Sequence, residues 1–224
     1  MPEKTVATLI PTFIKSNTPQ SMELEEKFSR IKENKWTTDT VLHEMGVQLG
    51  QLMNILNKQS QASQEAGRQF TDISDELCDI ALQLIYLTSA LSLDLSSISK
   101  EEKYIHFDST NLFDLYPLYG QITEAFLEEE KNRFAKPREG FATRLDFIKD
   151  RIVKMYIIIF NYAEEHSIDL NTRYRVMCSE ATRFVRQQSR KARFGIIKKI
   201  FTPKNPTIGP GDENGNARHF WWKL

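Results

Sequence analysis

Apolar residues recur every three or four positions along most of the chain, which is the periodicity of amphipathic α-helices. The first predicted helix follows Thr18-Pro19, because proline is favoured at the first helical position, and runs to about Trp36. A second begins near residues 37–40, and the polar segment 57–69 links it to a third. Together the second and third helices predict an antiparallel hairpin over about residues 38–95. The apolar stripe of the second helix contains Leu42, Met45, Leu49, Leu52, Met53 and Leu56.

A weaker second copy of this plan follows over about residues 111–170. Asp75 aligns with Asp150, and Asp94-Leu95 aligns with Asp169-Leu170, both at an offset of 75 residues. Two such hairpins predict an all-α fold with a four-helix core, built as a tandem repeat and flanked by further helices. The alternative is that any two amphipathic helical hairpins align this well, so the repeat stays one of two interpretations.

The end of the chain differs from the rest in composition. A last helix is predicted over about residues 171–199, which closes a single domain over residues 1–200. Residues 201–224 have the Pro, Gly and Asn content of a flexible tail, yet they end on His219-Phe220-Trp221-Trp222. We expect this aromatic end to dock on its own domain or on a partner.

The charge balance narrows the classes of function. Lys and Arg total 30 and Asp and Glu total 30, so the formal net charge is zero, which argues against a nucleic-acid binder. The two cysteines, Cys78 and Cys178, fall in predicted apolar helices and fit buried, reduced thiols. The most apolar run, residues 155–160, is too short to span a bilayer. These features predict a cytoplasmic protein without a membrane span.

Carboxylates provide the candidate chemistry. Glu76 and Asp79 are three residues apart on one helix face, and Glu44 lies on the preceding helix of the same hairpin. Acids that converge from two antiparallel helices can hold Mg²⁺ for phosphate chemistry. The alternative for Glu76 and Asp79 is an ordinary solvated face of an amphipathic helix.

These residues carry a resemblance to a known family. Glu76-Leu77-Cys78-Asp79 and the corner Leu91-Ser92-Leu93-Asp94-Leu95 resemble the second metal motif of the all-α nucleoside triphosphate pyrophosphohydrolases, which include MazG-type enzymes and dimeric dUTPases. The first metal motif of that family, Leu-Glu-Glu-x-Gly-Glu, is matched by Leu42-His43-Glu44-Met45-Gly46-Val47. His43 and Val47 therefore stand where the family has acids, and the expected four carboxylates become three.

The resemblance implies a divergent MazG-like enzyme that hydrolyses a (deoxy)nucleoside triphosphate to the monophosphate and pyrophosphate. Glu44, Glu76 and Asp79 would be the catalytic residues and the ligands of Mg²⁺, and the protein would be a homo-oligomer, as a dimer. The triphosphate also needs cations. Those predicted are Arg151 and Lys154, which occupy the positions of Glu76 and Asp79 in the second copy, with Arg183 and Arg186 on the last helix.

Two other functions fit the same residues. A helical scaffold or interaction protein would keep the fold and lose the metal site, as His43 and Val47 suggest. A third class would bind an anionic surface through the basic end of the last helix, although internal packing of that end is the favoured interpretation. The base and sugar of a nucleotide substrate are not determined by these motifs.

Overall fold

The computed structural model describes residues 6–32, 36–60, 73–130 and 139–201. These residues form α-helices joined by short 3₁₀ segments and contain no strand, so the predicted all-α fold is confirmed. The predicted tail from residue 202 onward and most of the linker between the first two hairpin helices lie outside the described residues. The helices are α1 (Val6–Lys32), α2 (Thr38–Ser60), α3 (Ile73–Ala90), α4 (Glu102–Ile105), α5 (Leu115–Glu130), α6 (Arg144–Glu165) and α7 (Leu170–Phe201).

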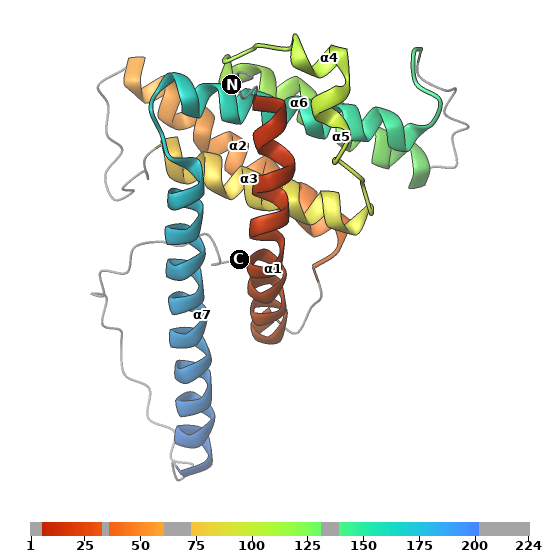
Figure 1. The fold of residues 1–224 in the computed structure, drawn as a ribbon. Helices are drawn as coiled ribbons and strands as arrows, with labels where there is room; N and C mark the ends of the chain where they lie inside the picture. Colours follow the sequence, from red (N-terminus) through yellow and green to blue (C-terminus); the bar gives the residue numbers. More distant parts are fainter. Residues whose placement is uncertain (1–5, 33–35, 61–72, 131–138, 202–224) are drawn as a thin grey trace.

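The two predicted hairpins form the centre of the molecule. Helix α2 packs on α3 and α5 packs on α6, while contacts of α3 with α6 and of α2 with α5 join the pairs. Helices α1 and α7 lie against each other and cross the central helices, as Figure 1 shows. The middle of α3 and of α6 is almost wholly buried, which explains their nearly continuous apolar sequences.

The corners that end α3 and α6 have the same geometry at the predicted offset. Ser92 and Ser167 both adopt a left-handed backbone, with φ of 51° and 55°. At each corner the next amide donates to the carbonyl five residues earlier, at 2.9 Å after α3 and 2.7 Å after α6. This is the Schellman pattern of helix ends. Leu95 and Leu170 are then equally buried, so the structure supports the tandem-repeat interpretation.

A close crossing holds α2 against α5. The Tyr119 hydroxyl on α5 donates to the carbonyl of Leu42 on α2 at 3.0 Å. The same hydroxyl lies over Gly46, where a Cβ would stand only 2.6 Å from it. A glycine in this helix therefore allows the second hairpin to approach the first.

Helix α1 corrects one prediction. It begins at Val6, so Pro19 lies inside the helix and not at its start. Ser16, Asn17 and Thr18, in the turn before Pro19, donate through their side chains to carbonyls of the preceding turn, at 2.7–2.9 Å. These bonds add a second donor to carbonyls of the turn before Pro19, whose missing N–H leaves the carbonyl of Lys15 without its helical donor. Ile10, which precedes Pro19 by two turns, is fully buried, so packing also stabilises the early turns.

Candidate functional site

The two acids of α3 do not lie on a solvated face. Glu76, in the first turn of α3, is only 1% exposed. Asp79, one turn further along, keeps part of its surface accessible but is surrounded by protein on its other sides. The alternative of an ordinary solvated helix face is therefore wrong for Glu76.

The carboxylates of the site repel one another electrostatically. Burial raises the pKa of Asp79 well above its usual value, and the negative charges of Glu76, Asp75 and Glu44 raise it further. Glu44 is on α2, so acids of both hairpin helices contribute, as the sequence predicted. Within the described part of the chain, the charges found to act on Asp79 are negative, and either a proton or a bound cation would relieve their repulsion.

Buried amide side chains extend this acidic region. Gln48 and Gln51 on α2 and Gln83 on α3 are 1–5% exposed, and their carboxamide oxygens have no hydrogen-bond partner. Spacings of three and four residues place these amides on the same helix faces as the acids. We call this set the polar strip, and it consists of Glu44, Gln48, Gln51, Glu76, Asp79 and Gln83.

The acids of the polar strip are not drawn together at metal-ligand distances. Among the described residues, no group of three or more His, Cys, Asp or Glu side chains is placed to hold a metal ion. Mg²⁺ needs oxygens at about 2.1 Å, so Glu44, Glu76 and Asp79 would have to rotate inward to share one. Their chemistry nevertheless fits, because carboxylate and carboxamide oxygens are the hard donors that this ion prefers.

The two substituted positions of the first motif lie at the surface. His43 is exposed, and Val47 is 43% exposed. Val47 is therefore at the open edge of the polar strip, where the family would place a fourth carboxylate.

A cation that the sequence analysis missed lies beside the acids. Arg173, in the first turn of α7, is 3.4 Å from the Asp75 carboxylate at the start of α3. Its Nε and Nη2 also donate to the Ser74 hydroxyl at 3.0 and 2.9 Å. The residues are almost a hundred positions apart, so only the packing of α7 on α3 reveals the pair.

The predicted phosphate-binding residues lie on α6 and α7, not on α3 with the acids Glu76 and Asp79. Arg151 and Lys154 both pair with Asp150 on their own helix, and Lys154 Nζ is 3.0 Å from that carboxylate. Arg183 and Arg186 are exposed on α7. No contact in the described residues brings Arg151 or Lys154 to Glu76 or Asp79.

The cysteines fulfil the prediction of buried packing residues. Cys78 and Cys178 are free thiols and fully buried. Burial raises the pKa of both, to about 12 for Cys178. Neither is therefore a nucleophile at neutral pH.

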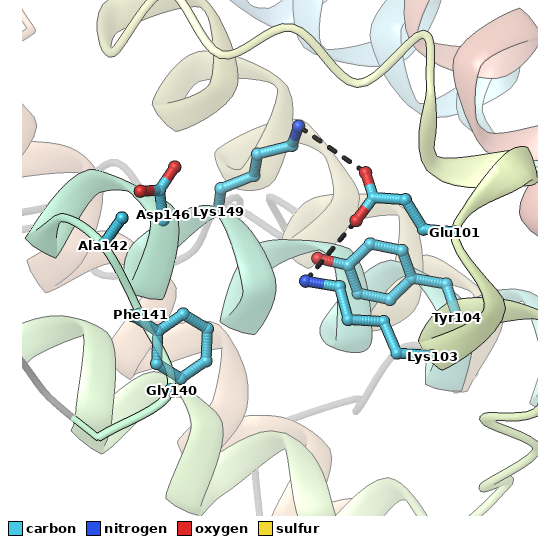
Figure 2. A pocket seen from close by; sticks show the side chains of 8 residues that line it. All are labelled: Glu101, Lys103, Tyr104, Gly140, Phe141, Ala142, Asp146 and Lys149. Carbon is cyan, nitrogen blue, oxygen red and sulfur yellow. Dashed lines mark ion pairs between the residues drawn. The ribbon is translucent and has the colours of Figure 1, made fainter.

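A small cavity opens between α4 and α6. Its volume is about 240 Å³. Figure 2 shows Lys103 and Lys149 pointing toward the carboxylate of Glu101, with Phe141 and Tyr104 on the walls. The cavity is lined by Glu101, Lys103, Tyr104, Gly140, Phe141, Ala142, Asp146 and Lys149.

Comparison of this chain with known protein families, with curated proteins and with solved structures finds no match. In the part of the chain that the structure describes, no helix has the length and apolar character needed to cross a membrane.

Proposed function

We propose that this protein is a divergent MazG-like nucleotide pyrophosphohydrolase, which hydrolyses a (deoxy)nucleoside triphosphate to the monophosphate and pyrophosphate with Mg²⁺. One observation carries the proposal: Asp79 lies where buried Glu76 and Glu44 of the neighbouring helix add their negative charges to its own. Acids gathered at one buried position raise the cost of burying charge, which a proton or a bound cation would lower.

The acidic residues of the site have a different proposed role from the basic ones. Glu44, Glu76 and Asp79 would hold Mg²⁺, and the free carboxamide oxygens of Gln48 and Gln51 offer further uncharged acceptors beside them. Bound there, the ion would bridge the triphosphate and lower the pKa of the attacking water.

Cations would position the remaining phosphate oxygens. Arg173 is the candidate nearest to the acids, through its pair with Asp75. Arg151 and Lys154, together with the exposed Arg183 and Arg186, remain proposed phosphate ligands. A homodimer also remains part of the proposal.

The test compares metal-dependent stability and turnover in matched variants. Thermal unfolding of the wild type with saturating Mg²⁺ should show a raised Tm, because a ligand at 100 times its Kd adds about 2.7 kcal/mol. Glu76→Gln should lose both this shift and hydrolysis of a nucleoside triphosphate panel. Glu180→Gln removes an exposed acid on α7 and should retain both. Equal Mg²⁺ shifts in the two variants would contradict the assignment.

The second candidate function is a helical scaffold or interaction protein that lacks the metal. The observation in its favour is that the acids do not converge at ligand distances in the described residues. This function predicts no Tm change with Mg²⁺ and no turnover. It also predicts self-association or partner binding that depends on residues 203–224, and sedimentation of the full chain beside a chain truncated at residue 202 measures this. Identical sedimentation of the two chains would count against it.

A further inference from the structure

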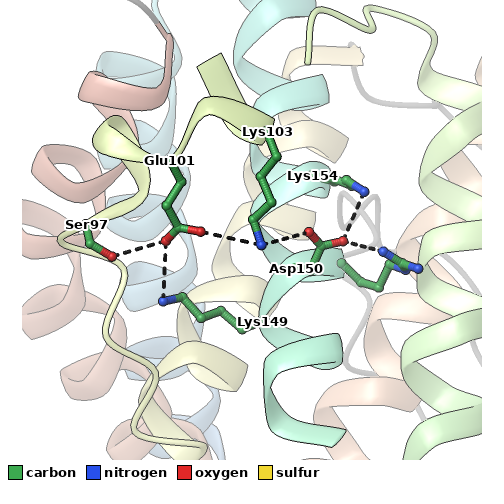
Figure 3. A network of polar contacts seen from close by, with 7 residues as sticks. Ser97, Glu101, Lys103, Lys149, Asp150 and Lys154 are labelled. Carbon is green, nitrogen blue, oxygen red and sulfur yellow. Dashed lines mark hydrogen bonds and ion pairs between the residues drawn. The ribbon is translucent and has the colours of Figure 1, made fainter. Parts of the chain in front are cut away.

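One buried carboxylate in the second hairpin is surrounded by three cations. Asp150 on α6 is 2% exposed at its side chain and pairs with Lys103, Arg151 and Lys154. Figure 3 shows Lys103 and Lys154 directed at it. Lys103 Nζ is 3.6 Å and Lys154 Nζ is 3.0 Å from its oxygens. A single carboxylate neutralises only one of the three positive charges.

The groups next to this cluster add acids as well as cations. Glu101 lies 3.4 Å from Lys103 and 3.9 Å from Lys149, so the connected network contains four cations and two carboxylates. Asp146 also lines the adjacent cavity, and its carboxylate accepts bonds from Thr143. With Asp146 and with Asp94, on which the charge of Lys149 acts, the wider region is neutral, so the surplus of two positive charges is confined to the three cations around Asp150.

The cations are held in place by the surrounding structure. The Arg151 guanidinium lies 4.3 Å from the centre of the Phe147 ring, and Lys154 Nζ lies 5.7 Å from that of Phe107. Such cation–π contacts fix the orientation of a charged group while leaving its outer donors available. Lys103 is 52% exposed and lines the cavity, so its ammonium is the most accessible of the three.

We propose that Lys103, Arg151 and Lys154 form a binding site for a phosphate group around Asp150, beside the cavity that Lys103 lines. Arriving phosphate oxygens accept hydrogen bonds from Lys103 and Lys154, and Lys103 exchanges its contact with Glu101 for the ligand. A phosphate monoester carries about −1.5 to −2 charges at neutral pH, which matches the local surplus. This inference rests on the proposed function for Arg151 and Lys154 as phosphate ligands and adds Lys103 and the place of the site, but phosphate binding there requires neither Mg²⁺ nor any acid of the polar strip.

The first test is calorimetric titration of inorganic pyrophosphate into the full chain in EDTA. We expect saturable binding to the wild type. Lys103→Gln should weaken it about tenfold, the effect of about 1.4 kcal/mol from one charge-assisted contact. Lys100→Gln removes an exposed lysine of the preceding 3₁₀ turn and should bind as the wild type does. Absence of binding to the wild type, or equal affinities of the two variants, would overturn the proposal.

A gain-of-binding variant guards against misfolding as the cause of a loss. Glu101→Gln removes the carboxylate that competes for Lys103 and Lys149, so pyrophosphate should bind it several-fold more tightly than it binds the wild type. Unchanged or weaker binding by a folded Glu101→Gln protein would contradict the exchange of contacts.

Two further titrations separate the sources of the phosphate and the two proposals. A nucleoside monophosphate that binds more tightly than inorganic phosphate identifies a nucleotide as the ligand, and equal affinities identify the free anion. Asp79→Asn should leave binding in EDTA unchanged even if it abolishes metal-dependent turnover. Loss of the EDTA binding in Asp79→Asn would show that the phosphate binds at the polar strip and would refute the separate site.

Discussion

The close crossing of α2 and α5 at Gly46 predicts that a larger side chain at this position lowers the stability of the fold. A Cβ at position 46 would stand 2.6 Å from the Tyr119 hydroxyl oxygen and 3.2 Å from Cζ of that ring. Ordinary van der Waals contact begins near 3.4 Å, so the hydroxyl must retreat by about 0.8 Å. That movement breaks its 3.0 Å bond to the carbonyl of Leu42.

Opposing contributions set the magnitude for Gly46→Ala. The lost hydrogen bond costs about 1 kcal/mol, and overpacking at a tight contact costs about 1–3 kcal/mol. Alanine in place of glycine within a helix returns about 1 kcal/mol. We therefore expect a net loss of about 1–3 kcal/mol in the free energy of unfolding. Tyr119→Phe alone should cost about 1 kcal/mol, because it removes the same hydrogen bond.

A double-mutant cycle measured by urea unfolding tests this reasoning. In the Tyr119→Phe background, Gly46→Ala meets no hydroxyl and loses no hydrogen bond, so its cost should fall by about 1–2 kcal/mol. Gly50→Ala is the matched control on the same helix, since no atom lies within 4 Å of its Cβ, and it should stabilise by about 1 kcal/mol. Additivity of the two substitutions within about 0.5 kcal/mol would refute the predicted contact.

Three further predictions concern charge, thiols and the repeated corners. The pKa of the Asp79 carboxyl is raised in the folded chain, so the contribution of Asp79 to stability is present below the usual Asp pKa and is lost as pH rises. Asp79→Asn should therefore raise the urea midpoint of unfolding at pH 7 in EDTA. An unchanged midpoint would contradict the raised pKa. Cys78 and Cys178 should react with a thiol reagent only as the protein unfolds, and rapid labelling of the native chain would disprove their burial. Ser92→Gly and Ser167→Gly should each stabilise by about 1 kcal/mol in thermal unfolding, because both positions have positive φ, whereas effects of opposite sign would argue against equivalent corners.

The periodicity predicted the hairpins well because each of their helices buries a continuous apolar face. Helix α2 begins at Thr38 and α7 spans Leu170–Phe201, close to the expected boundaries near residues 37–40 and over 171–199. The start of α1 was predicted wrongly because a local rule for proline took precedence over the burial of Ile10 and the side-chain bonds before Pro19. Local signals of this kind carry no information on what a helix packs against.

The candidate site was only partly predictable for a similar reason. Glu44 and the acids at the start of α3 were placed together because a helical hairpin fixes which faces meet. The buried glutamines of the polar strip and the cation Arg173 were missed, since their significance depends on burial and on the packing of α7. Lys103 was missed as well, because it approaches Asp150 from a short helix that the apolar pattern did not predict.

The acids at equivalent positions of the two hairpins each form an ion pair with a cation from outside their own hairpin. Asp75 and Asp150 are 75 residues apart, as are the two corners. Asp75 pairs with Arg173, which follows the second corner, while Asp150 pairs with Lys103, which follows the first. The two cations do not stand at equivalent positions, because at the same offset Arg173 aligns with Ile98 and Lys103 with Cys178, so these pairs indicate no symmetry between the hairpins.

The difference between the copies then lies in the residues next to these shared acids. The first copy continues with Glu76 and Asp79, and the second has Arg151 and Lys154 at the same positions. One framework thus carries a surplus of negative charge in one half and of positive charge in the other. Under the two proposals above, the acids of the first half would bind a cation and the cations of the second half a phosphate group.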